Sequence, residues 1–335
     1  SGNWEDDEDS NFNVGVGNYV MDADMDGAEG NTAAGTGALG GITTGDANVG
    51  VGRAAGNAIT TGTSNVAIGC YVDGTHQAPL ITNTDGSFNI AIGTGALQTA
   101  NDGDNDGTVA IGHRACQAQA GTGGVQFANS TIGIGYKTLT ALTTGSKNTA
   151  IGYQAMLDVV EGTNSVAIGY GAYGGALDTA ADASTDNIFI GYDAGSGDWV
   201  TATSSRNVGI GTSSMSAVMN ASNYNTSVGY ESLRDITIGT YNTAIGYRAG
   251  DNLTTALKCT LIGAEAGAAT LVASSATGTT AVGYQALNAL TSGAGNLAIG
   301  YSALSAQTDG TYNIAIGYEA MDAMSTGEDH NIGIG

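Results

Sequence analysis

The sequence predicts an all-β protein, a parallel β-solenoid of about 18 short coils. Three observations predict it. One short motif returns along the 335 residues, every repeat runs in the same direction, and β-branched residues hold a fixed place in it. The clearest form is Asn-Thr-Ala-Ile-Gly-Tyr at Asn148–Tyr153, which returns unchanged at Asn242–Tyr247. Sequence repeats of this length are typical of solenoids, in which each repeat forms one coil stacked on the next.

A glycine ends each repeat, and alignment on it gives 18 repeats and 17 intervals. Eight intervals are 17 residues long and the others are 18 to 24. Strands that recur in one direction cannot form hairpins, so we expect them to stack in parallel. At roughly 4.8 Å per coil, 18 coils predict a rod on the order of 85 Å long. The aligned glycines are Gly17, Gly35, Gly52, Gly69, Gly93, Gly112, Gly135, Gly152, Gly169, Gly191, Gly211, Gly229, Gly246, Gly263, Gly283, Gly300, Gly317 and Gly335.

The residues before the glycine predict the strand. Ile or Val directly precedes it in 17 of 18 repeats, and we expect these side chains to point into the coil as its core. Two residues before it, 15 of 18 repeats have Ala or Gly; Phe189, Ser227 and Leu261 depart. Because side chains alternate along a strand, we expect this small residue to face outward, towards a neighbouring chain. Asn stands four residues before the glycine in 13 repeats and can hydrogen-bond from coil to coil.

The residues after the glycine predict the rest of the coil. The segment Tyr-x-Ala-Leu is too short for a stable helix, so we expect one turn or a second short strand. Thr-Thr-Gly then closes the coil, as at Thr143–Gly145. Tyrosine follows the glycine in nine repeats, and rings on successive coils should stack. These nine are Tyr136, Tyr153, Tyr170, Tyr192, Tyr230, Tyr247, Tyr284, Tyr301 and Tyr318.

Composition limits the function classes. The chain has 31 acidic and 8 basic residues, and a net charge of −23 argues against partners such as nucleic acid or anionic membranes. No apolar run approaches the roughly 18 residues of a membrane helix, so we expect no membrane insertion. The last repeat stops at Gly335, and we expect the chain to be part of a longer protein. Cys70, Cys116 and Cys259 stand at different positions of the repeat, so we expect free thiols.

We expect residues 1–12 to be an acidic lead-in and residues 13–335 to form a single solenoid. Long intervals predict loop insertions near 70–88, 113–130, 170–186, 192–206 and 264–278, and binding residues tend to lie on such loops. His76 and Pro79 lie in the first insertion and Trp199 in the fourth. Trp199 is either a contact residue or a side chain that packs back onto the coils.

Two segments read Asp-x-Asp-x-Asp-Gly and resemble the first half of a calcium loop. The glutamate expected at the end of such a loop is missing, because Ala33 and His113 stand there. Neighbouring coils or chains would have to supply further oxygens; the alternative is a pair of solvated acidic turns. Calcium is the one cofactor that the sequence suggests. The candidate ligands are Asp22, Asp24, Asp26, Asp102, Asp104 and Asp106.

Nothing in the sequence indicates catalysis. The run Gly35–Gly40 fits G-x-G-x-x-G, but it is a by-product of the repeat and lacks a βαβ context. His76, His113 and His330 lie far apart in the repeat order, so neither a catalytic triad nor a histidine metal site is indicated. We predict that the protein is not an enzyme.

The repeat resembles two groups of surface proteins. Asn164–Gly169 resembles the head repeat of trimeric autotransporter adhesins (YadA-like heads), and Asn148–Met156 is similar to repeats of phage tail fibres. The resemblance covers nearly the whole chain from Asn13. It implies a left-handed parallel β-roll in a homotrimer, on a virion or cell surface, with a role in host attachment. The chain departs from the adhesin heads in its longer, irregular repeats, and these residues contain no neck, stalk or membrane anchor.

Three functions remain open at this point. The first is a structural and adhesive fibre shaft, from a phage tail fibre or a cell-surface adhesin, whose loops contact a host or cell-surface receptor or glycan. The second is the subunit of a self-assembling extracellular filament. The third is an ice- or surface-binding solenoid, in which corners such as Thr60–Gly62 and Thr143–Gly145 form a threonine array.

Overall fold

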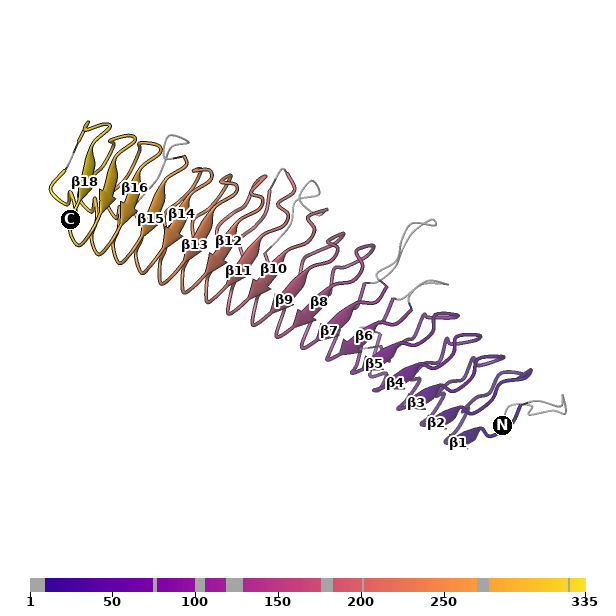
Figure 1. Ribbon diagram of the computed structural model, residues 1–335. Helices are drawn as coiled ribbons and strands as arrows, with labels where there is room; N and C mark the ends of the chain where they lie inside the picture. Colours follow the sequence, from indigo (N-terminus) through magenta and orange to yellow (C-terminus); the bar gives the residue numbers. More distant parts are fainter. Residues whose placement is uncertain are drawn as a thin grey trace. The chain divides into compact units, whose positions relative to one another are not determined.

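The structure, a computed structural model, describes residues 10–74, 77–99, 106–118, 129–175, 183–200, 202–269, 277–324 and 326–335. The chain divides into two compact units, Ser1–Ser165 (the N-terminal unit) and Val166–Gly335 (the C-terminal unit). Each unit is a stack of coils with one three-residue strand per coil (Figure 1). The described residues include no helix, and hence none long and apolar enough to cross a membrane.

Consecutive strands within each unit pair in parallel and in register. Ala244 of β13, for example, lies opposite Ser227 of β12 and Leu261 of β14. The predicted parallel β-solenoid of about 18 coils is confirmed. The strands of the N-terminal unit are β1 (Val14–Val16), β2 (Thr32–Ala34), β3 (Val49–Val51), β4 (Val66–Ile68), β5 (Ile90–Ile92), β6 (Val109–Ile111), β7 (Ile132–Ile134) and β8 (Thr149–Ile151). Those of the C-terminal unit are β9 (Val166–Ile168), β10 (Ile188–Ile190), β11 (Val208–Ile210), β12 (Thr226–Val228), β13 (Thr243–Ile245), β14 (Thr260–Ile262), β15 (Thr280–Val282), β16 (Leu297–Ile299), β17 (Ile314–Ile316) and β18 (Ile332–Ile334).

The orientation expected for the strand side chains is wrong. The middle residue of each strand is the one that points into the coil: Ala244 is fully buried, whereas Ile245 is exposed. The physical reason is the narrow interior, which long side chains from the opposite wall already fill. At Gly50 an added Cβ would lie 2.8 Å from Leu39 Cγ, so this coil has no room even for a methyl group at the inward strand position. The β-branched residues on either side therefore face outward.

The opposite wall of the coil supplies most of the core. Its buried side chains are the Leu or Met of Tyr-x-Ala-Leu and an Ile, Leu or Val three residues later, as in Leu233 and Ile236. This segment is a turn in which Glu231 (φ 51°) and Leu233 (φ 46°) are left-handed, a conformation that side chains disfavour. Hydrogen bonds to adjacent coils hold it, from Glu231 N to Thr212 O (2.9 Å) and from Leu233 N to Ala249 O (3.0 Å).

Large residues at the inward strand position are matched by glycines around them. Phe189 occupies that position in β10, and a Cβ added at Gly195 or Gly209 would lie 2.6 or 2.7 Å from its ring. Leu261 occupies it in β14, and a Cβ at Gly267 would lie 2.8 Å from Leu261 Cδ2. Each exception is thus accommodated by the removal of a neighbouring side chain.

Polar side chains also stack inside the coils, as predicted for the asparagines. Asn225 Oδ1 accepts hydrogen bonds from both the backbone N and the side-chain Nδ2 of Asn242, each at 3.0 Å. The hydroxyl of Ser214 donates to Ser227 Oγ at 2.7 Å, which satisfies the one hydroxyl at the inward strand position. These contacts lock the register of adjacent coils.

The glycine after each strand makes a corner that no other residue fits. Gly246 has φ 138°, and an added Cβ would lie 2.5 Å from the carbonyl oxygen of Gly263 on the next coil. The corner therefore needs glycine both for its backbone conformation and for the close stacking of coils.

Parts of all five predicted insertions lie outside the described residues, namely 75–76, 119–128, 176–182, 201 and 270–276, as does 1–9 of the acidic lead-in. His76 belongs to this group. Pro79, from the first insertion, is buried, and its carbonyl accepts a hydrogen bond from Gly56 N at 3.1 Å.

Candidate functional site

The outer side of the strands is an apolar surface, here called the strand face. Each strand contributes two outward residues, which are Val, Ile, Leu, Thr or, once, Ala34, and none is charged. The outward residue next to the corner glycine is 36% to 40% exposed in seven strands remote from the chain ends. These residues are Val51, Ile68 and Ile151 in the N-terminal unit and Ile210, Ile245, Ile262 and Ile299 in the C-terminal unit. Contiguous apolar patches on protein surfaces are a common feature of interaction sites.

Tyrosine rings form ladders beside the corners, as predicted. In the N-terminal unit His113 stacks on Tyr136 (ring centroids 5.4 Å apart) and Tyr136 on Tyr153 (5.1 Å). In the C-terminal unit the stacked pairs are Tyr170–Tyr192, Tyr230–Tyr247, Tyr284–Tyr301 and Tyr301–Tyr318, at 5.2 to 5.5 Å. The stacked faces cover one another, so mainly ring edges and hydroxyls meet solvent.

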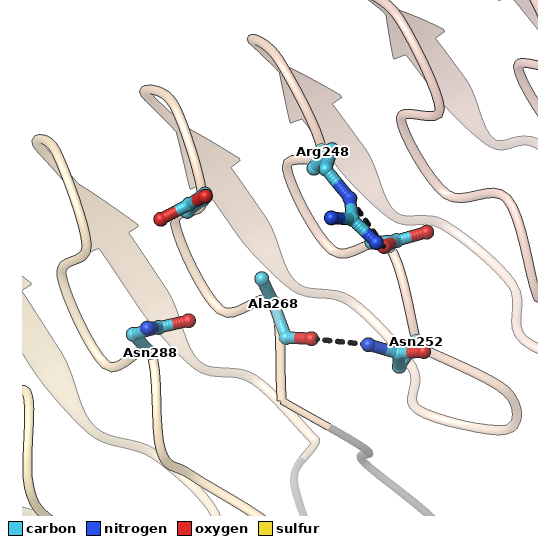
Figure 2. Close-up of a pocket in the computed structure, with 6 residues that line it drawn as sticks. Arg248, Asn252, Ala268 and Asn288 are labelled. Carbon is cyan, nitrogen blue, oxygen red and sulfur yellow. Dashed lines mark hydrogen bonds and ion pairs between the residues drawn. The ribbon is translucent and has the colours of Figure 1, made fainter.

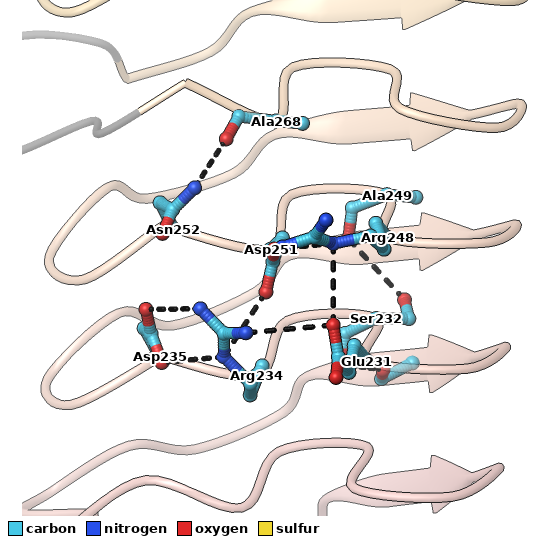
Figure 3. Close-up of polar contacts among 10 residues, drawn as sticks. Glu231, Ser232, Arg234, Asp235, Arg248, Ala249, Asp251, Asn252 and Ala268 are labelled. Carbon is cyan, nitrogen blue, oxygen red and sulfur yellow. Dashed lines mark hydrogen bonds and ion pairs between the residues drawn. The ribbon is translucent and has the colours of Figure 1, made fainter.

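Five charged side chains on two neighbouring coils of the C-terminal unit make a network, here called the ion cluster (Figure 3). Arg248 Nη2 lies 2.7 Å from Asp251 Oδ2, and Arg248 Nε lies 3.2 Å from Glu231 Oε2. Arg234 Nε lies 2.9 Å from Asp235 Oδ1 and 3.2 Å from Asp251 Oδ1. Asp251 thus binds both guanidinium groups.

Burial and neighbouring charges shift the pKa values within the ion cluster. The side chain of Asp251 is 1% exposed, and this burial raises its pKa, while Arg234 and Arg248 act in the opposite direction. A hydrogen bond to Asp235 raises the pKa of Arg234, and one to Asp251 raises the pKa of Arg248. Removal of Arg234 or Arg248 would leave the buried Asp251 carboxylate with one fewer cationic partner.

A hollow of about 200 Å³ opens beside the ion cluster, here called the β14 hollow (Figure 2). Its shape follows from Ala268, which stands five residues after its corner glycine, where the adjacent repeats have Asp251 and Asn288. Asn252 Nδ2 donates to Ala268 O at 2.7 Å, which fixes one wall. The lining residues are Arg248, Asp251, Asn252, Glu265, Ala268 and Asn288.

The calcium prediction is not tested by the structure. Asp22, Asp24 and Asp26 lie exposed on the surface. Asp106 Oδ1 accepts a hydrogen bond from Ser87 N at 2.7 Å, while Asp102 and Asp104 lie outside the described residues. Across the described part of the chain, no three His, Cys, Asp or Glu side chains are close enough to hold a metal ion.

The two described histidines pack on tyrosines, His113 on Tyr136 and His330 on Tyr312 at 5.3 Å between centroids. Trp199 is fully buried, with its ring centroid 4.6 Å from that of Tyr173 and 5.8 Å from that of Phe189. Of the two roles considered for Trp199, packing onto the coils is the correct one.

The predicted free thiols are confirmed. Cys70 is exposed, and Cys116 and Cys259 are buried. Burial raises the pKa of the Cys116 thiol to about 12 and also raises that of Cys259.

The ion cluster and the β14 hollow were not predicted from the sequence. A signal for the cluster exists, because Glu231 and Arg248, like Arg234 and Asp251, stand 17 residues apart with opposite charges. One coil is 17 residues long there, so such pairs are neighbours in space.

No protein-family model and no curated protein sequence matches the chain.

Proposed function

We propose that the chain is a shaft segment of an extracellular fibre, in which copies of the chain associate side by side as a homotrimer through the strand face. The observation that supports the proposal is the recurrent partial exposure of mostly β-branched side chains along the strands of each unit. A partner with the same repeat offers an apolar residue at every coil. An identical chain meets this requirement without any further adaptation, and closed homo-oligomers are the commonest assemblies.

Charge supports the same choice of partner. Copies with a net charge of −23 repel one another, yet the strand face carries no charged residue. The acidic residues that the structure describes lie outside the strands, so association through the strand face brings apolar surfaces together while these charges stay solvated.

The resemblance to adhesin heads and tail fibres supports the proposal that this shaft belongs to a virion or cell surface, with loops that contact a receptor. The threonine corners favour a structural role over ice or surface binding. Thr60 Oγ1 donates to Thr84 O at 3.0 Å, and Thr143 Oγ1 donates to Val160 O at 3.3 Å. Hydroxyls used between coils are not free to order water in a flat array.

Sedimentation equilibrium tests the proposal. We expect a mass three times the 33.1 kDa of one chain. The double variant Ile245→Asp/Ile262→Asp should reduce the measured mass to that of one chain. Association of this variant would bury two carboxylates from every copy in the contact. Ile238→Asp is the matched control, since Ile238 is also exposed but stands at a coil corner away from the strand. A monomeric wild-type chain would contradict the homotrimer.

Electron microscopy separates the shaft from the filament. A shaft gives particles of fixed length, and a self-assembling filament gives open-ended polymers whose length grows with concentration.

A further inference from the structure

The tyrosine ladder of the C-terminal unit is interrupted at Ala264. Tyr247 stacks on Tyr230 with one face, and Tyr284 stacks on Tyr301 with one face, so the opposite faces of Tyr247 and Tyr284 are directed towards the β14 coil. That coil has a methyl group where its neighbours have a ring. Tyr247 and Tyr284 remain partly exposed, by 48% and 42%.

The gap has the thickness of one ring. Adjacent rings of the ladder lie 5.2 to 5.5 Å apart. Tyr247 and Tyr284, two coils apart, are therefore about 10 Å apart, and a ring inserted between them would lie about 5 Å from each, within the usual range for ring contacts.

The β14 hollow belongs to the same coil. Glu265 follows Ala264 directly and lines the hollow, and Ala268 leaves the space where adjacent coils carry Asp251 and Asn288. Gln285 Nε2 donates to Glu265 Oε2 at 2.7 Å, which holds this carboxylate in place. The β14 coil is thus truncated at two positions, one beside aromatic faces and one beside polar groups.

We propose that this truncated coil binds a neutral saccharide, with hydroxyls in the β14 hollow and the C–H face of a sugar ring over Ala264 between the two tyrosines. A hydroxyl both donates and accepts hydrogen bonds, so it can satisfy the Glu265 carboxylate and the Asn252 and Asn288 amides together. Aromatic surface with a few convergent polar groups is typical of small-molecule sites. The hollow is smaller than the roughly 300 Å³ at which drug-sized pockets begin, which suits a single sugar ring.

The charges of the site disfavour anionic ligands. Arg248 is the one cation among the lining residues, and it is already paired with Glu231 and Asp251. Two carboxylates and one guanidinium leave the hollow with a net negative charge, so a phosphate, sulfate or uronate would be repelled.

The proposal rests on the proposed function, because it gives the fibre shaft a ligand class for its contact with a surface. Saturation-transfer difference NMR of the full chain tests it, with glucose, galactose and N-acetylglucosamine as probes and glucuronate as the charged comparison. We expect saturation transfer to at least one neutral sugar and a weaker signal from glucuronate. No transfer to any of the three neutral sugars would overturn the proposal.

Two variants fill the gaps with residues that adjacent coils already carry, Ala264→Tyr and Ala268→Asn. Each should fold with an unchanged or higher melting temperature and should weaken sugar binding at least tenfold. Thr212→Tyr is the matched control, because Thr212 interrupts the same ladder between Tyr192 and Tyr230 and lies outside the β14 hollow. Its affinity should equal that of the wild type.

Wild-type affinity in both filling variants would overturn the proposal. Dissociation of the oligomer by Ala264→Tyr would also overturn it, since the gap would then hold a side chain from another copy of the chain. The mass of the wild type, measured in the same samples, is a separate readout. A monomeric chain that still binds sugar would contradict the homotrimeric shaft but not the saccharide site.

Discussion

Leu261 and Gly267 offer a direct test of which strand residues point into the coil. Leu261 takes the inward position of β14, where most repeats have Ala or Gly, and Gly267 takes the position where most repeats have a long core side chain. A Cβ at Gly267 would lie 2.8 Å from Leu261 Cδ2. The two residues therefore share one space, and substitutions at them should be strongly coupled.

The magnitudes follow from core packing. Leu261→Ala should destabilise the coil by about 2–5 kcal/mol, because it leaves a cavity. Gly267→Leu should cost about 1–3 kcal/mol or more, because the new side chain overlaps Leu261. The double variant restores the usual residues at both positions, so its cost should be at least about 2 kcal/mol below the sum of the single costs.

Native-state hydrogen exchange at the amides of Thr260–Ile262 is the suitable assay, since solenoids can unfold coil by coil and a global midpoint would average over many coils. Additive costs, or a Gly267→Leu variant as stable as the wild type, would refute an inward Leu261 and with it the orientation of every strand.

Three further predictions concern stability. Asn225→Ala removes the acceptor of two buried hydrogen bonds from Asn242 and should cost about 2–4 kcal/mol in urea unfolding. The folded state keeps the Cys116 proton to a pKa of about 12, while the unfolded thiol ionises above its ordinary 9.0. Above pH 9 the unfolded state then binds fewer protons, so the free energy of unfolding falls as pH rises from 9 towards 12. The loss is about 1.4 kcal/mol at pH 10. The variant Cys116→Ala should lack this loss between pH 8 and pH 10. Ala47→Gly should be neutral or stabilising by up to about 1 kcal/mol in thermal unfolding, because Ala47 is exposed with φ 54°.

Two of these predictions have a control variant. Cys70→Ala should keep the alkaline loss, since the Cys70 thiol is exposed; equal pH slopes for wild type and Cys116→Ala would count against the burial argument. Ala244→Gly, inside a strand, should be destabilising, and a similar loss for Ala47→Gly would mean that the left-handed conformation carries no cost. An Asn225→Ala variant as stable as the wild type would show that the asparagine stack is dispensable.

The repeat predicted the parts of the fold that depend on period alone. Equal spacing in one direction leads to parallel strands in register, and it places Asn225 beside Asn242 and Tyr230 beside Tyr247. These contacts need no knowledge of which face is inside, because a residue in a solenoid always meets its equivalent on the next coil.

The inside and outside of the strand could not be read from the repeat in the same way. The position of Ile245 holds Ile or Val in nearly every repeat, which indicated burial. The alternation of side chains along a strand separates two faces, but it does not say which face is interior. The volume of the opposite wall decides, and Leu233 already fills it. One signal did exist in the sequence: the large exceptions Phe189 and Leu261 coincide with glycines at nearby core positions, which only an inward strand residue would require.

The ion cluster and the β14 hollow depend on exceptions to the repeat. Ala264 and Ala268 are ordinary small residues in the sequence, and they define a site only because adjacent coils carry larger side chains at the same positions. Both features are visible in the sequence when each residue is set beside its equivalents one coil away.

Disulfide cross-linking between copies tests the central claim, that the strand face joins copies of the chain. In a Cys70→Ser background, which removes the exposed native thiol, Ile245→Cys places a thiol on the strand face and Ile238→Cys places one at a coil corner. A disulfide needs Cα atoms about 4.4–6.8 Å apart. We predict rapid cross-linking of copies through residue 245 under mild oxidation and none through residue 238. Cross-linking through residue 238 without cross-linking through residue 245 would contradict the account.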